Sequence, residues 1–404
     1  MRFLHAADIH LDSPLAGMTH RDPELARLTA TCTRDAFSNV VDEAIAHDVA
    51  FLLIAGDLYD AEHKNYETGL FFAREMQRLG RRCIIIHGNH DSASQITRSL
   101  HPPPNVTILP SRNADKVVLE EHGVAIHGQS FHGRAEAEDL AARYPDRVAG
   151  VFNIGLLHSS MEDPGDHARY APCRLETLLA KNYDYWALGH VHTRATLHER
   201  PWIHVPGNTQ GRHVRETGPR GATLVEVEDG HVRPPSFIPT DVVRWAVLPL
   251  DVAGMDSIEA LTALVRFELE AAALAAEGRP VIVRIVLDGA TPLHAALLSD
   301  PAGIDAQCRA AAAAVGPDVH VERVRLRTRP TESGGSDSAA LEQAVRAALA
   351  DPALVASLLK DFERMAGAIP AGATAEVPRT ADDLAALQDD AWSVIRHALT
   401  GGAA

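Results

Sequence analysis

Short clusters of Asp, Asn and His residues stand at the ends of five apolar runs in the first half of the chain. They are Asp8-Ile9-His10, Gly56-Asp57, Gly88-Asn89-His90-Asp91, His158 and Gly189-His190-Val191-His192. In open α/β sheets, functional side chains gather where strands give way to loops at their carboxyl ends. Carboxylate, imidazole and amide groups together are ligands of divalent Mn, Fe or Zn rather than of soft metals or calcium. The clusters therefore predict a metal site assembled from several strand ends.

The spacing within the clusters supports one shared site. Asp8 and His10 are two residues apart, as are His190 and His192, so each pair can lie on one face of an extended strand. A glycine precedes three of the clusters and lets the chain turn sharply there. The two oxygens of Asp57 can bridge two cations, and cations about 3.5–4 Å apart can clamp a phosphate. A single histidine at a strand end is usually structural, so the metal interpretation depends on the joint occurrence of the clusters in this order.

Strand and helix patterns alternate around the clusters. Residues 2–7, 51–55 and 83–86 are apolar runs that predict buried strands, and stretches with helical spacing of apolar residues lie between them. Apolar strands separated by helices predict an α/β sandwich, which we assign to residues 1–240.

Two further regions are predicted beyond Val242. A β-α-β-α-β pattern predicts a small α/β domain over residues 241–330. Residues 331–336 have the composition of a flexible linker. Residues 338–399 predict two or three amphipathic helices, so residues 331–404 form a helical C-terminal extension that either docks a partner or packs on its own core.

Composition limits the functional classes. The 404 residues include 38 Lys and Arg against 54 Asp and Glu, a formal net charge of −16. A protein that holds duplex DNA by a broad basic surface normally has the opposite sign, so any polyanion must be handled by a local site or with a partner. No apolar run approaches the roughly 20 residues of a membrane span, and four widely spaced cysteines indicate reduced thiols in a cytoplasmic protein.

The ordered clusters resemble the signature of the calcineurin-like metallophosphoesterase superfamily, and the similarity covers roughly residues 1–227. The opening run from Phe3 to Asp12 narrows the resemblance to SbcD-type DNA repair exonuclease subunits, in particular their YhaO-like branch. Residues 170–173 and 206–213 are also similar to that branch. The resemblance implies a two-sheet α/β sandwich with a dinuclear metal site, followed by a capping domain that shapes access to the metals.

The resemblance also implies a role for each clustered residue. One metal would be held by Asp8, His10, Asp57 and His192. The other would be held by Asp57, Asn89, His158 and His190, with Asp57 bridging. His90 would protonate the leaving oxygen or stabilise charge on phosphorus, with Asp91 orienting its imidazole. Some family members carry a second histidine three positions after the bridging aspartate, where this chain has Asp60.

The implied reaction is hydrolysis of a DNA phosphodiester by a metal-activated hydroxide, with two divalent ions, manganese first and iron or zinc as options. The implied partners are DNA and an SbcC-like coiled-coil ATPase, and family members often form homodimers. Arg212 and His213 are candidates for contact with the DNA backbone, a solvated basic loop being the alternative. The residues leave two other functions open, a small-substrate phosphodiesterase or phosphatase and a scaffold without turnover.

Overall fold

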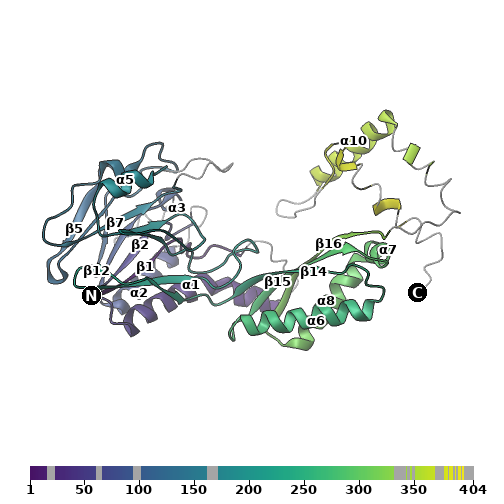
Figure 1. The fold of residues 1–404 in the computed structure, drawn as a ribbon, viewed down its shortest axis with the longest axis horizontal. Coiled ribbons are helices and arrows are strands. Elements are labelled where there is room, and N and C mark those ends of the chain that lie inside the picture. Colours follow the sequence, from purple (N-terminus) through teal and green to yellow (C-terminus); the bar gives the residue numbers. More distant parts are fainter. Residues whose placement is uncertain are drawn as a thin grey trace. The chain divides into compact units, whose positions relative to one another are not determined.

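The computed structural model describes residues 1–15, 23–60, 66–93, 102–161, 172–331 and 351–368, with scattered positions between 343 and 394. The chain divides into two compact units, Met1–Trp245 and Ala246–Ala404 (Figure 1). Among the described residues, no helix combines the length and apolar character needed to span a bilayer.

The first unit contains two sheets. The first sheet has the order β12-β11-β1-β2-β3-β4, with β13 pairing β11, and the second has the order β5-β6-β7-β8-β10-β9. The strands of the first sheet are β1 (Arg2–Ala6), β2 (Phe51–Ala55), β3 (Arg82–Ile86), β4 (Val106–Ile108), β11 (Gly221–Glu228), β12 (His231–Val232) and β13 (Ser236–Pro239). Those of the second are β5 (Asp115–Leu119), β6 (Val124–Gly128), β7 (Phe152–His158), β8 (Tyr185–Gly189), β9 (Ala195–Glu199) and β10 (Trp202–Val205).

The central strands of both sheets are parallel, so their carboxyl ends lie at one edge of each sheet. Strands β1 to β4 pair in parallel, as do β6, β7, β8 and β10. The helices of this unit are α1 (Pro23–Ala46), α2 (Tyr66–Leu79), α3 (Asn89–Ala93) and α5 (Leu175–Ala180).

Two apolar layers explain why these strands are continuous hydrophobic runs. Phe3 and Phe51 point between the sheets and join Ile154 of β7 in one core. Their neighbours Leu4 and Leu52 point to the other face, where they pack on α1 and α2. Strands buried on both faces cannot alternate apolar with polar residues. The predicted two-sheet α/β sandwich is therefore confirmed.

The second unit is a three-stranded sheet with helices on one side (Figure 1). Its elements are β14 (Arg244–Asp251), which begins at the end of the first unit, α6 (Ile258–Ala275), β15 (Val281–Ala290), α7 (His294–Ser299), α8 (Pro301–Val315) and β16 (Val319–Arg329). Helices α6 and α8 start at N-caps, since the Ser257 and Asp300 side chains accept backbone N–H groups of the first turn. Apolar residues of these helices and of all three strands form one core.

The C-terminal region contains the helix α10 (Pro352–Ala368). The rest of the predicted helical stretch of residues 338–399 lies largely outside the described residues, as does the predicted linker beyond Thr331. Two residues of the motif at 170–173, Tyr170 and Ala171, also lie outside them.

Candidate metal centre

The predicted ligands lie just beyond the carboxyl ends of strands from both sheets, and the backbone there is strained. Four of them have positive φ angles: 51° at Asp8, 47° at His10, 51° at Asp57 and 90° at His190. A non-glycine residue in this region costs on the order of 1–3 kcal/mol, and such strain persists where the surrounding structure enforces it. Here the loops after β1 and β2 hold each other, because Asp8 N–H donates to Gly56 O at 3.1 Å and His10 N–H to Asp57 O at 3.0 Å.

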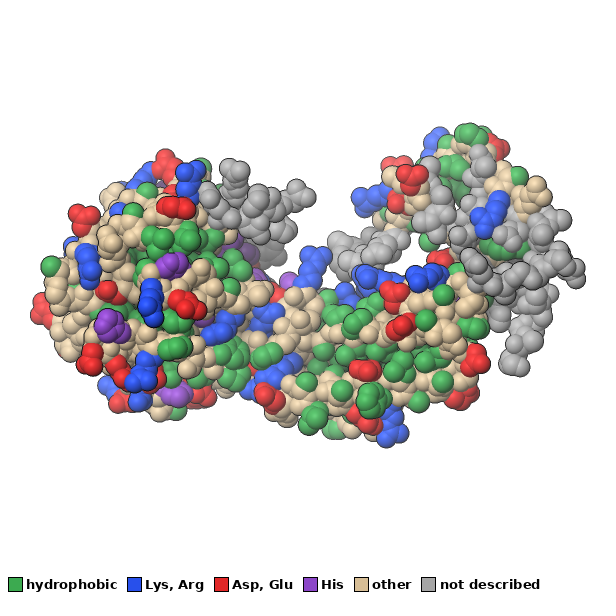
Figure 2. All heavy atoms as spheres, viewed as in Figure 1, with side chains coloured by type: hydrophobic (Ala, Val, Ile, Leu, Met, Phe, Trp, Pro, Cys, Tyr) green, Lys and Arg blue, Asp and Glu red, His purple; other side chains and the backbone are tan. Residues whose placement is uncertain are grey.

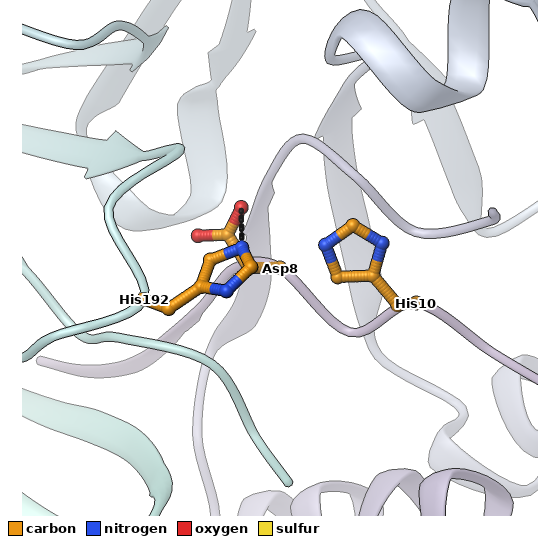
Figure 3. Close-up of side chains that lie close together, drawn as sticks. All are labelled: Asp8, His10 and His192. Carbon is orange, nitrogen blue, oxygen red and sulfur yellow. Dashed lines mark ion pairs between the residues drawn. The ribbon is translucent and has the colours of Figure 1, made fainter. Parts of the chain in front are cut away.

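Asp8, His10 and His192 form what we call the first half of the metal centre (Figure 3). One candidate ligand atom from each lies within 4.8 Å of the others, and His192 Nε2 is 3.8 Å from Asp8 Oδ1. His10 is fully buried, and neither ring nitrogen has a hydrogen-bond partner among the described residues. Burial and the nearby Arg212 guanidinium lower the pKa of His10, so its ring is neutral. A buried imidazole without a partner is costly unless a ligand satisfies it, which fits a metal ligand.

Asn89, His158 and His190 form the second half of the metal centre together with Asp57. The His158 Nε2 atom lies 3.0 Å from Asn89 Oδ1, 3.2 Å from His190 Nδ1 and 3.5 Å from Asp57 Oδ2. The other ring nitrogen of His158 donates to the Ala55 carbonyl at 2.9 Å, so a neutral ring directs its lone pair at the same point as the other acceptors. Burial lowers the pKa of His158, but the Asp57 carboxylate outweighs burial and raises that pKa to about 9. The Asp57 carboxylate therefore stabilises positive charge next to it.

Asp57 lies between the two halves. Its Oδ1 accepts the His90 backbone N–H at 3.0 Å. Its Oδ2 faces His10 Nε2 at 3.8 Å and His158 Nε2 at 3.5 Å, so one oxygen faces both halves. Burial raises the pKa of Asp57, but His158 and His10 outweigh burial and hold it well below its ordinary value. An ionised carboxylate in this position suits a bridge between two cations.

Two glycines leave the space that the second half requires. A Cβ at Gly88 would overlap Asp57 Oδ1 and lie 2.8 Å from His158 Nε2. A Cβ at Gly189 would overlap the Ala55 carbonyl oxygen, which is the acceptor of the His158 ring. The prediction for these glycines is a sharp turn with the backbone passing close to the metal site, and at these two positions close packing around the ligands is what excludes a side chain.

His90 is the second residue of the short helix α3 and is oriented by a different aspartate from the one predicted. Its Nδ1 lies 3.0 Å from Asp60 Oδ1, and this hydrogen bond raises the pKa of His90 above its ordinary value. The other oxygen of Asp60 accepts the Ser13 hydroxyl at 2.8 Å. Asp60 thus occupies the place where some family members have a second histidine, and it supports His90.

The prediction that Asp91 orients His90 is wrong. Asp91 is fully buried, and its carboxylate accepts the backbone N–H groups of Leu58, Tyr59 and Gly88 at 2.7–3.1 Å. Burial and the neighbouring Asp57 raise the pKa of Asp91 to about 7. Asp91 therefore fastens the loop after β2 to the start of α3.

Glu216 is a residue of the site that the sequence analysis missed. Its Oε1 lies 2.6 Å from His192 Nδ1, and its Oε2 accepts the Arg212 backbone N–H at 2.6 Å. Burial raises the pKa of Glu216, but the hydrogen bonds and charges of His192 and Arg212 together outweigh burial and lower it to about 2. A carboxylate that holds one ring nitrogen of a histidine directs the other nitrogen towards a metal.

The structure brings Arg212 to the edge of the site. Its Nη1 donates to Ser13 Oγ at 3.2 Å and lies 3.8 Å from Asp60 Oδ2. His213 is more exposed and contacts Glu216 at 3.6 Å. Contact of either residue with substrate stays a prediction.

Two groups of metal ligands at the strand ends of a two-sheet α/β sandwich, with a histidine beside them, define a metal-dependent phosphoesterase. Comparison with known families agrees with this class. Residues 1–194 match the model of the calcineurin-like phosphoesterases, and residues 245–329 match the model of the middle domain of metallophosphoesterase YhaO.

The chain is similar to an uncharacterised metallophosphoesterase, YhaO, of Bacillus subtilis (strain 168). The two are 36% identical over 301 residues, which cover 72% of each protein. The chain therefore belongs to the calcineurin-like metallophosphoesterases, in their YhaO-like branch.

More distant relatives include two archaeal proteins named as the DNA double-strand break repair protein Mre11. The one from Sulfurisphaera tokodaii is 25% identical over 203 residues, covering 48% of this chain and 49% of that protein. The one from Haloferax volcanii is 28% identical over 294 residues, covering 69% of this chain and 61% of that protein.

Proposed function

We propose that this phosphoesterase is a nuclease that hydrolyses DNA phosphodiesters. The observation that carries the proposal is His90, which is held by Asp60 beside both halves of the metal centre. Cleavage of DNA releases a sugar alkoxide, a poor leaving group that needs a proton in the transition state. A histidine with a raised pKa retains the proton that such a leaving group requires. The similarity to two proteins named for DNA double-strand break repair supports the same substrate.

In this proposal, different residues of the chain bind the metal ions and donate the proton. Asp8, His10 and His192 would hold one divalent cation, Asn89, His158 and His190 would hold the other, and Asp57 would bridge them. When bound, the cations supply Lewis acidity, which lowers the pKa of water and neutralises phosphoryl oxygens. His90 would donate its Nε2 proton to the leaving oxygen, and Asp60 would hold the ring through Nδ1.

Four further parts of the proposal concern the metal, the partner, the location and the oligomeric state, and they rest on the ligand chemistry, the widely spaced cysteines and the resemblance to SbcD-type subunits. Manganese suits the mixture of carboxylate, imidazole and amide ligands, and iron and zinc suit it as well. An SbcC-like ATPase would be the partner, and the C-terminal helices would be its docking region. A cytoplasmic location and a homodimer complete the proposal.

The test is degradation of end-labelled linear DNA with Mn²⁺, with bis-p-nitrophenyl phosphate as a second substrate. Wild-type protein should degrade the DNA, and EDTA should stop it. His90→Ala should slow DNA cleavage by about 10²–10⁴-fold, the contribution typical of a general acid, with its bound metal retained. The loss should be smaller with bis-p-nitrophenyl phosphate, because nitrophenolate leaves without a proton.

Three outcomes would overturn the proposal. Undiminished DNA cleavage by His90→Ala would remove His90 from the chemistry. Intact DNA with hydrolysis of bis-p-nitrophenyl phosphate, even after addition of an SbcC-like ATPase, would indicate a phosphoesterase for small substrates. Binding of the ATPase without hydrolysis of either substrate would indicate a scaffold.

A further inference from the structure

Strand β16 of the second unit carries an arginine at every second position near its end. The four residues are Arg323, Arg325, Arg327 and Arg329. Alternate residues of a strand point to the same face and recur roughly 6.6–6.8 Å apart. The strand lies at one end of the order β14-β15-β16. Four guanidinium groups thus form a row along an edge of the sheet, which we call the arginine row.

The residues between the arginines show which face the row occupies. Val324 and Leu326 pack against the core that contains α6 and α8. Thr328 is buried, and its hydroxyl lies 2.9 Å from His294 Nδ1 of α7. The arginine row therefore lies on the face of the sheet that points away from these helices. Figure 2 shows blue Lys and Arg side chains along the part of the second unit where Figure 1 draws β16.

A shift in strand register sets where the row begins. Val283 of β15 pairs with Val321, but Arg284 pairs with Arg323, so Glu322 is an extra residue on β16. Both oxygens of Glu322 bind the Arg284 guanidinium at 2.7 Å. The carboxylate closest to the row in sequence is therefore already committed to another arginine.

The exposed end of the row is the part available to a ligand. Arg327 and Arg329 are exposed, whereas Arg323 and Arg325 are half-buried and make other contacts within the chain. Asp288 of β15 is the register partner of Arg327 and reduces the local positive charge. Arg329 pairs in register with Ala290, which offers no charge.

Protection of an edge strand against aggregation is the simplest alternative, because charged side chains on an edge discourage pairing with another chain. That role needs a charge, but it does not need four of one sign. Two unit charges about 6.7 Å apart in water repel by roughly 0.6 kcal/mol, so the exposed pair of Arg327 and Arg329 carries a small cost that an anionic ligand would remove. Arginine also binds phosphate through two parallel N–H groups, which lysine does not.

We propose that the arginine row binds the phosphodiester backbone of a nucleic acid, with Arg327 and Arg329 as its main contacts. This inference rests on the proposed nuclease function and adds a substrate-binding surface outside the metal centre. The arginine row also reconciles DNA binding with the acidic composition, because a chain with a net charge of −16 must bind a polyanion through a local basic surface. Contacts to phosphate carry no sequence information, so the row binds any sequence equally.

The test measures binding of fluorescein-labelled DNA by anisotropy over a range of salt concentrations, with EDTA present to prevent cleavage. For duplex DNA each phosphate contact contributes about 0.9 to the slope of log K against log[salt]. The double variant R327Q/R329Q should therefore reduce the slope by about 1.8 and weaken binding about tenfold at low salt. The double variant R327K/R329K keeps both charges and should retain most of the slope.

A charge-matched control excludes a general effect of net charge. R112Q/R266Q removes two exposed arginines, one from the first unit and one from the helix side of the second. It should leave both the affinity and the slope near wild-type values. Hydrolysis of bis-p-nitrophenyl phosphate should be unchanged in all variants, which shows that the metal centre is intact.

The outcomes separate this inference from the proposed function. If R327Q/R329Q binds and cleaves DNA like wild type, the row does not hold DNA although the nuclease function stands. If that variant self-associates with unchanged DNA affinity, the arginines protect the edge strand, and the inference is wrong. If wild-type protein neither binds nor cleaves DNA, the proposed function fails first, and an acidic protein becomes the candidate ligand of the row.

Discussion

The two halves of the metal centre are held in different ways. In the second half, the main chain orients the ligands, because the Ala55 carbonyl fixes the His158 ring and two glycines let the strands close around it. In the first half, the His190 backbone N–H holds the Asp8 carboxylate, but a loop side chain orients the histidine, because Glu216 fixes His192. His10 has no hydrogen-bond partner on its ring among the described residues.

This difference shows which ligands the strand ends position by themselves and which ligand needs a residue from a loop. Main-chain groups at strand ends are positioned by the sheets, so the second half is preorganised by the fold itself. The first half depends on one carboxylate from a segment outside the strands. Substitution of side chains should therefore affect the first half selectively, whereas the second half should be sensitive to added bulk.

Asp57→Asn should have the largest effect, because Asp57 is common to both halves. Asparagine keeps the shape and an oxygen acceptor for the His90 N–H, but it removes the charge that faces both histidines. Bound metal should fall from two ions per chain to one or none, and phosphodiester hydrolysis should be lost. Elemental analysis of the purified protein measures the number of bound metal ions. Asp115→Asn, at an exposed position, is the control. Two bound ions with full activity would show that Asp57 does not join the halves.

Gly88→Ala should damage the second half more than the first. The added methyl would overlap the Asp57 carboxylate and press on His158, and overpacking of this kind costs about 1–3 kcal/mol. The variant should unfold at lower urea concentration and lose one of two metal ions. Gly133→Ala is the matched control, because a Cβ there has no neighbour within 4 Å. Equal stability of the two variants would mean that close packing at Gly88 is not required.

Most of the fold, and the meeting of most candidate ligands at one place, were predictable because the signals are local. The apolar runs of β1, β2, β3, β7 and β8 end directly in the polar clusters, and parallel strands bring their carboxyl ends together. The clusters therefore meet in space although nearly two hundred residues separate the first from the last.

The contacts that the sequence analysis missed have no such local signal. The resemblance implies Asp91 as the partner of His90, but neighbouring residues of a helix do not face each other. The actual partner, Asp60, comes from the loop after β2. Glu216 contacts His192 across an irregular loop, and no periodicity predicts that pairing. The alternation of the arginine row is visible in the sequence, but its face depends on the register shift at Glu322.

Glu216→Ala should weaken the first half and leave the second half unchanged. Loss of a carboxylate behind a metal-binding histidine typically reduces metal affinity about 10–100-fold. Titration of the metal-free protein with Mn²⁺ should show one binding step weakened and the other unaltered. Glu216→Gln should fall between wild type and alanine, because it keeps an acceptor for His192. Glu226→Gln, at an ion pair with Arg2 on the surface, is the control. Equal weakening of both steps would contradict the division of the centre into two halves.

Asp60→Asn should have the smallest effect on metal binding. It should slow catalysis without changing the metal content of either half. Asp60 hydrogen-bonds the His90 ring and lies near His10 without being one of the predicted ligands, so both metal ions should stay bound. DNA cleavage should slow about tenfold, less than the 10²–10⁴-fold expected for loss of His90 itself. Hydrolysis of bis-p-nitrophenyl phosphate should change little, since its leaving group needs no proton.

Asp91→Asn should behave differently, because Asp91 accepts three backbone N–H groups. It should lower the free energy of unfolding by about 1–3 kcal/mol and slow both substrates equally. If Asp91→Asn shows the dependence on leaving group and Asp60→Asn does not, the adjacent aspartate orients His90 after all.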